Sequence, residues 1–320
     1  MMIKTYCISE YLDEKNIRKI TEVCEKCGSS IVFYKSAADS DGRVADAEVV
    51  YCNDPAVLSQ MKHLKWCHAD SAGVNNYMET GLFDDGTIML TNSSGAFGRA
   101  IAEHIIMVTL MLMRKMPEYQ KIVSEKRWEN DLPVSTIADS NIAVIGTGDL
   151  GRTAAEKFKS LGAARVAGFS RSGKFKEPFD EVHQMREFAD NACNADVVVV
   201  CLPDTPETKG LINEEILAAI PASAYLINVG RGVTVDQDAL IAALNEGRLA
   251  GAALDVVTPE PLPADHPLWT AKNCIITPHC SGDMGLEYSV DRTFDIFCEN
   301  LERYAKGADL INLVDPRKGY

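Results

Sequence analysis

One ten-residue segment constrains the fold of this chain more than any other. Residues 142–151 read IAVIGTGDLG, an apolar run typical of a buried strand that ends in a GxGxxG turn, and a helix-forming stretch from Arg152 to Leu161 follows at once. In such a turn the first glycine permits the bend, the second lets the backbone approach a pyrophosphate, and the third lets helix and strand pack closely. The N–H groups at the helix N-terminus also attract phosphate. The segment therefore predicts a dinucleotide-binding turn, in preference to a purely structural one.

The residues after the next predicted strand indicate which nucleotide binds. A fold that binds NAD places a carboxylate about 20 residues beyond the glycines, where it holds the ribose 2′-OH. Here the strand at 165–169 is followed by Ser170, Arg171 and Ser172. A guanidinium and two hydroxyls suit a 2′-phosphate, although a basic solvated loop would have the same composition. We expect NADP (NADPH) to be preferred and NAD to be possible.

Length and charge limit the class of protein. A chain of 320 residues favours two domains. The net charge of −14 argues against nucleic acid and anionic membrane as partners. The longest apolar segment, 105–113, is too short to span a bilayer and predicts a buried helix, and the N-terminus lacks the apolar region of a signal peptide. These features predict a cytoplasmic protein.

The ten cysteines are scattered, and several lie in apolar runs where they would pack as small core residues. Cys24 and Cys27 form a CxxC inside an amphipathic helical stretch, without a second pair at the spacing of a zinc site. We predict no metal, and free thiols suit a reducing compartment. Cys280 is interpreted as a small core residue more readily than as a redox switch.

The chain alternates between strand and helix patterns, which predicts parallel sheets covered by helices. In the first hundred residues the strand candidates are 3–7, 30–34, 48–52, 65–68 and 87–90, with a helix at 14–27. One long helix is expected from Arg99 to about Arg127, and a last helix from Gly285 to Lys306. Between them six strand candidates follow, the number that a full doubly wound dinucleotide domain needs: 142–145, 165–169, 197–201, 224–229, 251–255 and 274–277.

Three polar side chains follow strands of this second set. Arg231 lies in the glycine-flanked segment NVGRG, Glu260 in the proline-rich segment TPEPLP, and His279 in TPHCSG. Ligands of open α/β sheets bind beyond the carboxyl ends of the strands, so the three side chains are expected to meet at one site. Each alone would fit a surface charge, a solvated loop residue or a strand-end histidine, but three at neighbouring strand ends favour a catalytic site.

The three groups suit reduction of a carbonyl by hydride. A cationic imidazole can give the carbonyl oxygen a proton, a nearby carboxylate keeps that imidazole charged near neutrality, and an arginine can hold a substrate carboxylate. We therefore expect an oxidoreductase that uses a nicotinamide nucleotide to convert a 2-ketoacid into a 2-hydroxyacid, or the reverse.

At this point the chain resembles the D-isomer-specific 2-hydroxyacid dehydrogenase family over nearly its whole length. The resemblance rests on Ser71-Ala72-Gly73-Val74, Thr91-Asn92-Ser93, Ile101-Ala102-Glu103, IGTGDLG, Leu202-Pro203 with Pro206-Glu207-Thr208, NVGRG, LDVVTPEPLP and TPHCSG. In its Ser170-Arg171-Ser172 segment the chain is similar to the NADPH-using glyoxylate and hydroxypyruvate reductases. Because the chain ends soon after the last helix, a phosphoglycerate dehydrogenase with a C-terminal regulatory domain is disfavoured.

The resemblance implies the fold and the site residues. It implies a flavodoxin-like substrate domain (1–98 plus 288–320) and an inserted Rossmann dinucleotide-binding domain (99–287), in a homodimer. The catalytic residues would be Arg231, Glu260 and His279. Backbone amides of Ala72, Gly73 and Val74 would hold the substrate carboxylate together with Arg231 and His279, while Asp255 and the Val229 carbonyl would orient the nicotinamide. The implied cofactor-binding set is Gly146, Thr147, Gly148, Asp149, Leu150, Gly151, Ser170, Arg171, Ser172, Leu202, Pro203, Thr208, Val229, Gly230, Asp255, Ser281 and Gly282.

Two alternatives stay open from the sequence. One is an NADH-preferring D-2-hydroxyacid dehydrogenase. The other is a nucleotide-sensing binding protein, because the resemblance extends to transcriptional corepressors that share the fold. The complete set of catalytic residues favours an enzyme over a binding protein. Loops near Asn53, Val74 to Tyr77 and Ala96-Phe97 are expected to select the side chain of the ketoacid, along with residues from a partner subunit.

Overall fold

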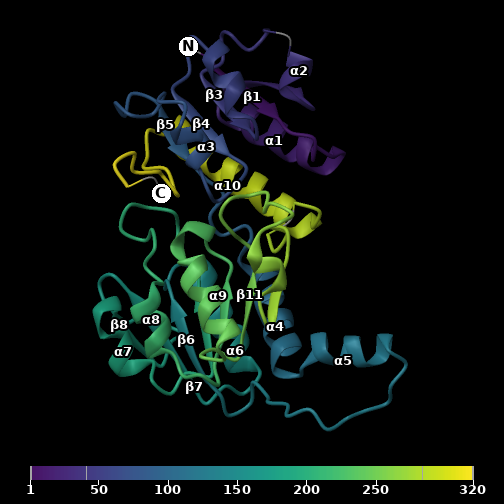
Figure 1. Cartoon of the computed structure of the whole chain (residues 1–320). Helices are drawn as coiled ribbons and strands as arrows, with labels where there is room; N and C mark the ends of the chain where they lie inside the picture. Colours follow the sequence, from purple (N-terminus) through teal and green to yellow (C-terminus); the bar gives the residue numbers. More distant parts are fainter. Residues whose placement is uncertain (1, 41, 283, 319–320) are drawn as a thin grey trace. The chain divides into compact units, whose positions relative to one another are not determined.

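The chain forms two compact units, shown in Figure 1. The structure is a computed structural model that describes residues 2–40, 42–282 and 284–318. Residues 1–97 with 283–320 make the first unit, and residues 98–282 make the second. The domain boundaries that the sequence suggests, after residues 98 and 287, stay a prediction.

The first unit is built on a parallel sheet whose order, within the described residues, is β2-β1-β3-β4-β5. This is the flavodoxin-like order expected for the substrate domain. The strands are β1 (Ile3–Ile8), β2 (Ser29–Tyr34), β3 (Val49–Cys52), β4 (Trp66–Ala69) and β5 (Met89–Thr91). The helices are α1 (Glu14–Lys26), α2 (Ala37–Ser40), the 3-10 turn η1 (Pro55–Gln60), α3 (Asn75–Met78) and α10 (Glu287–Ala305).

The chain returns to the first unit through α10, which packs on the same side of the sheet as α1. The side chain of Asp13 caps α1 by accepting the Asn16 N–H at 2.7 Å. Phe294 and Phe297 of α10 lie against the strand residues Tyr51 and Trp66, with the Tyr51 and Phe294 rings 4.9 Å apart. Segments from the two ends of the chain therefore share one core.

The second unit has a parallel sheet in the order β12-β11-β10-β9-β6-β7-β8 among the described residues. Counted from β6 this is the Rossmann order with a seventh strand at one edge. Its strands are β6 (Asn141–Ile145), β7 (Arg165–Ser170), β8 (Glu181–Gln184), β9 (Val197–Val200), β10 (Tyr225–Asn228), β11 (Gly251–Leu254) and β12 (Cys274–Ile276). Its helices are α4 (Gly98–Met113), α5 (Met116–Ser124), α6 (Asp149–Ser160), η2 (Met185–Glu187), α7 (Phe188–Asn191), α8 (Glu214–Ala219), η3 (Gly232–Thr234), α9 (Gln237–Asn245) and η4 (Pro267–Thr270).

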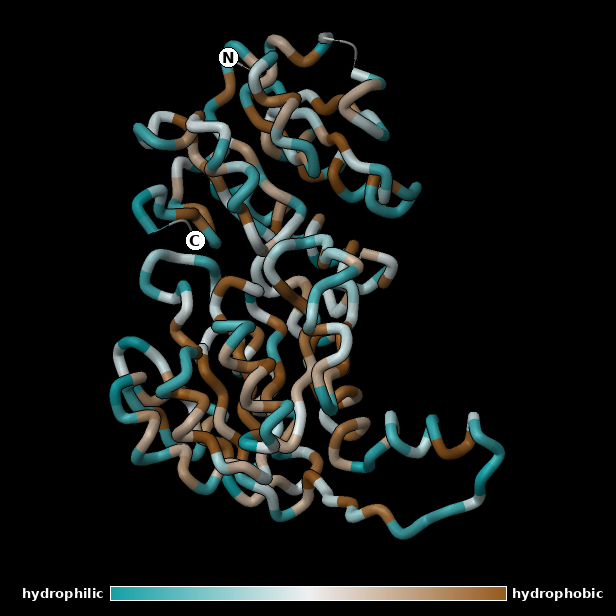
Figure 2. Tube along the Cα trace, viewed as in Figure 1, coloured by the Kyte–Doolittle hydropathy of each residue, from teal (hydrophilic) through white to brown (hydrophobic). Residues whose placement is uncertain are grey.

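The central strands of this sheet are buried on both faces. All four valines of β9 have 0% exposed surface, as expected for a strand covered by helices on either side. Figure 2 shows these strands as the hydrophobic interior of the second unit, with hydrophilic residues on the surrounding helices. The sheet therefore gives the loops at its carboxyl edge a rigid base.

The long helix expected from Arg99 to Arg127 is wrong, because the structure breaks it. α4 ends at Met113, Lys115 takes a left-handed backbone with φ of 56°, and α5 begins at Met116. Pro117 explains the break, since proline lacks the N–H for a helical hydrogen bond and its ring clashes with the carbonyl four residues before it. The segment 105–113 is helical, and Ile105, Val108, Thr109, Leu112 and Met113 are buried as the prediction of a buried helix requires, but Met107 and Leu110 are 46% and 37% exposed, so one face of the helix is not covered by the described residues.

Two features are absent from the described residues. No helix among them combines the length and the apolar character that crossing a membrane requires. No group of three or more His, Cys, Asp or Glu among them is arranged to hold a metal ion. Cys24 lies in the core of the first unit, and Cys27 ends α1.

Candidate active site

The glycine turn joins β6 to α6, and two of its glycines are required by their neighbours. Gly146 has φ of 102°, and a Cβ atom there would lie 2.6 Å from the Cys201 carbonyl oxygen. A Cβ atom at Gly151 would lie 1.9 Å from the Gly146 carbonyl oxygen. Any side chain at either position would force the turn or the helix away from the sheet.

The middle glycine of the turn faces open space instead of protein. Gly148 is the N-cap residue of the twelve-residue helix α6 and makes no side-chain cap hydrogen bond, and a Cβ atom there would have nothing within 4 Å. The N-terminal N–H groups of α6 are therefore open to a phosphate, as a dinucleotide requires. Thr147 and Leu150 complete this turn. The Asp149 carboxylate lies beside Gly98 of α4, so of this residue the backbone N–H is the group that could meet a phosphate.

Ser170, Arg171 and Ser172 form a tight turn after β7. The Ser170 hydroxyl accepts the N–H of Gly173 at 3.1 Å, and the Ser172 hydroxyl accepts the N–H of Lys174 at 3.3 Å. Each hydroxyl therefore keeps its own proton to donate elsewhere. Arg171 is exposed in this turn. The three side chains form a set of hydrogen-bond donors that suits a phosphate.

The loop after β9 holds three more of the predicted cofactor residues. The Thr208 hydroxyl donates to the Pro203 carbonyl at 2.6 Å and accepts the Thr205 N–H at 2.9 Å, so it stabilises the loop itself. Leu202 is packed against Gly230, where a Cβ atom would lie 2.5 Å from the Leu202 carbonyl oxygen. The loops after β9 and β10 therefore form one continuous wall beside the glycine turn.

Arg231 follows β10, and its backbone is held by Asn228 and Thr234, for which the sequence alone predicts no role. The Asn228 amide donates to the Arg231 carbonyl at 3.1 Å and accepts the Gly230 N–H at 3.1 Å. The Thr234 hydroxyl also donates to the Arg231 carbonyl, at 2.6 Å. Burial lowers the pKa of Arg231, and the charges of Glu260 and Asp204 oppose that shift. The guanidinium is thus partly desolvated and stays charged.

The side chains of Glu260 and His279 are hydrogen-bonded to each other, as their places at strand ends predict. His279 Nδ1 lies 2.8 Å from Glu260 Oε2, and Glu260 Oε1 accepts the Val257 N–H at 2.9 Å. Because an ionised carboxylate can only accept, His279 Nδ1 carries the proton in this bond and Nε2 is the ring nitrogen left for a substrate. The His279 and Glu260 side chains are 49% and 35% exposed, so a small molecule can reach them.

Asp255 holds the turn that presents His279. Its carboxylate accepts the Cys280 N–H at 3.0 Å and the Ser281 N–H at 3.1 Å, and its carbonyl accepts the His279 N–H at 2.9 Å. Burial alone would raise the pKa of Asp255, but hydrogen bonds from Ser281, Thr277 and Cys280 lower it overall. Gly282 ends the turn, and Val229 is buried at the end of β10. Cys280 is exposed, so its interpretation as a core residue is wrong.

The loop predicted to hold the substrate carboxylate belongs to the first unit. Three of its backbone carbonyls are bonded within that unit: Ser71 O accepts Ser93 N–H, Ala72 O accepts the Asn92 amide, and Gly73 O accepts the Ser71 hydroxyl. Their engagement leaves the N–H groups of the loop as the ones that could meet a carboxylate. Val74 and Tyr77 are buried in the core, so their side chains stabilise the loop from beneath.

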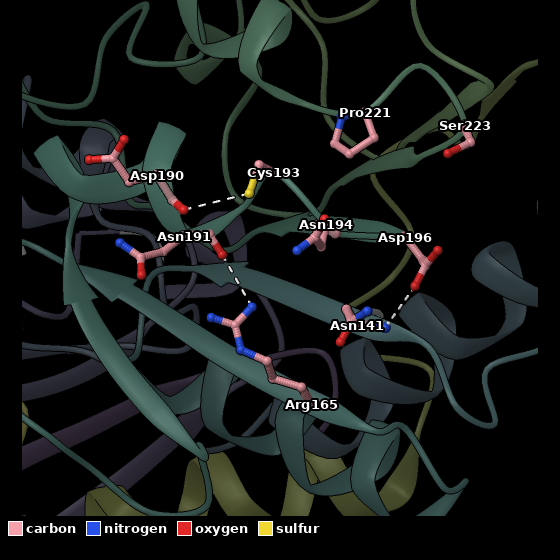
Figure 3. A pocket seen from close by; sticks show the side chains of 10 residues that line it. Asn141, Arg165, Asp190, Asn191, Cys193, Asn194, Asp196, Pro221 and Ser223 are labelled. Atoms are coloured by element: carbon pink, nitrogen blue, oxygen red, sulfur yellow. Dashed lines mark hydrogen bonds between the residues drawn. The ribbon is translucent and has the colours of Figure 1, made fainter.

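A surface pocket of about 630 Å³ lies at the opposite edge of the second sheet. Figure 3 shows its side chains, which come from the amino ends of β6 and β7 and from segments that precede β9 and β10. Here the Asp196 carboxylate accepts the Asn141 N–H at 2.8 Å, and Arg165 donates to the Asn191 carbonyl at 3.1 Å. These side chains form hydrogen bonds with backbone groups near the starts of strands. The pocket is not part of the nucleotide site.

Comparison with known proteins agrees with this geometry. A family model described as D-isomer specific 2-hydroxyacid dehydrogenase, NAD binding domain, matches residues 106–281. The glyoxylate/hydroxypyruvate reductase A of Klebsiella pneumoniae subsp. pneumoniae is 32% identical over 291 residues, which cover 88% of this chain and 89% of that protein.

Solved structures give the same result. A D-isomer specific 2-hydroxyacid dehydrogenase family protein from Aeromonas salmonicida subsp. salmonicida has a TM-score of 0.85 and 30% identity, and the match covers 99% of this chain and 100% of that one. A D-isomer specific 2-hydroxyacid dehydrogenase from Xanthobacter autotrophicus, in complex with NADPH and MES, has a TM-score of 0.82 and 30% identity, covering 99% of each chain.

The chain therefore belongs to the D-isomer specific 2-hydroxyacid dehydrogenase family, and the resemblance inferred from its motifs is confirmed. It is an NAD(P)-dependent oxidoreductase, as predicted, with the two parallel-sheet α/β units of that family.

Proposed function

We propose that the enzyme reduces a 2-ketoacid to a D-2-hydroxyacid, or catalyses the reverse, with NADPH as the preferred cofactor and His279 as the proton donor. The observation that carries this proposal is the 2.8 Å hydrogen bond between His279 and Glu260, in the unit that also holds the glycine turn. An imidazole held by a carboxylate, with its second nitrogen directed elsewhere, is the usual form of a general acid and base.

In this proposal each residue of the site has a separate role. A bound nicotinamide nucleotide would supply the hydride that reaches the carbonyl carbon of the substrate. His279 Nε2 gives its proton to the carbonyl oxygen, and Glu260 stabilises the imidazolium before that transfer. Arg231 holds the substrate carboxylate and draws electron density from the adjacent carbonyl. In the oxidative direction His279 takes the hydroxyl proton.

In the first unit, backbone amides of residues 72–74 are the groups that we propose to bind the substrate carboxylate. With the carbonyls of Ser71, Ala72 and Gly73 bonded inward, the loop offers its N–H groups to an anion. Such amide groups recognise a carboxylate without regard to the rest of the acid. The side chain of the acid would be selected by the loops near Asn53, Val74 to Tyr77 and Ala96-Phe97.

The preference for NADPH is supported by the turn after β7. Arg171 can donate two parallel hydrogen bonds to a 2′-phosphate, and the Ser170 and Ser172 hydroxyls each have a proton to add. The relative from Xanthobacter autotrophicus was solved with NADPH.

The proposal includes a homodimer. Apolar side chains are exposed along α4, α5 and the segment after them, including Met107, Leu110, Val123 and Trp128, the last 99% exposed. Figure 1 shows α5 and this segment extending away from the sheet of the second unit. A second copy that covers them would remove this apolar surface from water. Light scattering should give a mass of about 70 kDa, twice the 35.0 kDa of one chain, and a mass of one chain would contradict the dimer.

A substrate panel tests the reaction. Purified enzyme is mixed with a series of 2-ketoacids, each with NADPH and with NADH, and the loss of absorbance of the reduced nicotinamide is followed. We expect at least one ketoacid to be reduced, at a higher kcat/KM with NADPH, and the product to be the D isomer on a chiral column. If no ketoacid is reduced, the proposed reaction is wrong. If NADH is used better, only the cofactor preference is wrong.

A further inference from the structure

A partly buried histidine on α4 contacts the hydrogen-bond network beneath the turn that holds His279. The side chain of His104 is 10% exposed, and its Nε2 lies 3.3 Å from Thr277 Oγ1 and 3.9 Å from Asp255 Oδ1. Helix α4 packs on β10 and β11, which places His104 at the carboxyl edge of the second sheet. Neither the GxGxxG turn nor the His279–Glu260 pair includes this residue.

The direction of each hydrogen bond follows from counting protons. Thr277 Oγ1 lies 2.6 Å from Asp255 Oδ1, and an ionised carboxylate can only accept, so the single hydroxyl proton of Thr277 points to Asp255. Toward His104 the Thr277 oxygen can then only accept. His104 must therefore donate through Nε2–H, and in its neutral form its Nδ1 carries no proton.

The surroundings of His104 favour its neutral form. Burial lowers the pKa of His104, and the nearby charge of Asp255 opposes that shift without reversing it. The ring thus contributes one N–H donor and no full charge. The two hydrogen bonds run in one direction, from His104 to Thr277 and from Thr277 to Asp255.

Asp255, the last acceptor in this series of hydrogen bonds, holds the backbone around His279. Asp255 accepts the N–H groups of Cys280 and Ser281 through its carboxylate. His279 has a left-handed backbone with φ of 52°, a conformation that is uncommon for residues other than glycine. A change in the position of the carboxylate would therefore move the imidazole.

We propose that His104 is a positioning residue for the reaction, which acts through Thr277 and Asp255 to hold the turn that aims His279. This inference rests on the proposed role of His279. It assigns to helix α4 a part in catalysis, although no atom of His104 needs to touch the substrate.

The first test is the tautomer of His104, and it needs no substrate. Long-range proton–nitrogen NMR spectra of the full chain, labelled at histidine and free of cofactor, separate Nε2–H from Nδ1–H rings. The signals of His104 are assigned by their loss in His104→Gln. We expect the Nε2–H tautomer at neutral pH, and a change in those signals in Thr277→Val. An Nδ1–H ring would overturn the inference.

The second test is kinetic. His104→Leu removes the donor at similar volume, and His104→Gln restores an N–H at similar reach. Because one neutral hydrogen bond is lost, kcat should fall about 3- to 10-fold in the leucine variant, with KM for ketoacid and NADPH within about twofold, and the glutamine variant should recover most of the loss. In a Thr277→Val background His104→Leu should have little further effect, because the chain is already broken.

The control variant is Thr109→Val on the same helix. Thr109 is buried, and its hydroxyl has no hydrogen-bond partner within the described part of the chain, so kcat should not change. An unchanged kcat in His104→Leu, or a glutamine variant as slow as the leucine variant, would overturn the inference. Failure of the proposed function would appear differently, as a wild-type enzyme that reduces no ketoacid while the tautomer is still as expected.

Discussion

His279 combines an unusual backbone with a proposed chemical role. Its left-handed φ of 52° is uncommon for residues other than glycine, with asparagine, aspartate and histidine the ones that adopt it most readily. Asparagine is therefore the substitution that removes the imidazole with the least disturbance of the turn. Glutamine or alanine would add backbone strain to the loss of the acid.

The first prediction concerns that substitution. His279→Asn should lower kcat for ketoacid reduction by at least about 10²-fold, the usual contribution of a general acid, while affinity for NADPH stays near that of the wild type. Steady-state kinetics and fluorescence titration with NADPH provide the two measurements. His63→Asn, at an exposed histidine of the first unit, is the matched control and should leave kcat unchanged. A His279→Asn enzyme with near-normal kcat would show that another group supplies the proton.

The second prediction concerns Glu260. Glu260 Oε2 lies 2.8 Å from His279 Nδ1, where a carboxylate would stabilise the proposed proton donor by a charge-assisted hydrogen bond, and glutamine would replace it with a neutral amide. The proposed reduction requires the protonated imidazole, so in Glu260→Gln the alkaline limb of the kcat/KM profile should move to lower pH. The profile is measured from about pH 5 to pH 10 for both enzymes. If the limb stays in place, Glu260 does not act on the proton of His279.

Some residues of the candidate site can be predicted from the sequence, and others are found only in the structure. Arg231, Glu260 and His279 could be proposed from the sequence because each follows a recognisable strand and carries a charge or an imidazole. His104, Asn228 and Thr234 could not, because their part depends on hydrogen bonds to residues that only packing brings near. No local pattern around His104 distinguishes it from a core histidine.

Among the elements, the turn after β7 is the one that we propose to select the cofactor. The third prediction is that Arg171→Ala removes most of the preference for NADPH, chiefly by raising KM for NADPH, with little effect on NADH. A charge-assisted contact with the 2′-phosphate is worth about 1.5–3 kcal/mol, a preference of roughly 10- to 150-fold. Lys176→Ala, which removes another exposed cation from the same loop, is the control. An equal loss in both variants would point to general charge attraction instead of a specific contact.

The strands were predictable where they are apolar and not where they are polar. The four valines of β9 and the run before the glycine turn were found from sequence, since both are buried on two faces. The edge strand β8 reads EVHQ, and all four of its residues are only partly buried, so it has no apolar pattern to detect. The break between α4 and α5 is not predicted from the sequence because the helical pattern continues past Pro117. That proline is the one local signal of the break.

For the molecule as a whole, one buried carboxyl links stability to pH. Asp70, at 9% exposed, follows β4, and burial raises its pKa to about 6, with a further rise from Glu10 and an opposing backbone hydrogen bond. The carboxyl of an unfolded chain titrates near pH 3.9, as is usual for aspartate. The folded state thus binds more protons than the unfolded state between about pH 4 and pH 6, and stability falls as pH rises through that window.

The fourth prediction follows from this linkage. Asp70→Asn should raise the free energy of unfolding by about 1–3 kcal/mol at pH 8, where the buried charge is fully present, and give no comparable gain at pH 3.5, where the carboxyl is protonated in both states. Urea unfolding at the two pH values is the measurement. A gain of the same size at both would mean that the effect of the amide is unrelated to ionisation.

The second unit is one uninterrupted stretch of chain, residues 98–282, flanked by the two segments of the first. The proposed proton donor, its carboxylate partner, the arginine and the nucleotide-binding turns are all encoded within that stretch. Recombination that exchanged the flanking segments with those of a relative would be expected to change which acid is accepted while the hydride chemistry and the nucleotide preference are inherited together. An enzyme of this family could therefore gain activity on a new acid by exchange of these two segments, while the residues proposed for hydride and proton transfer stay unchanged.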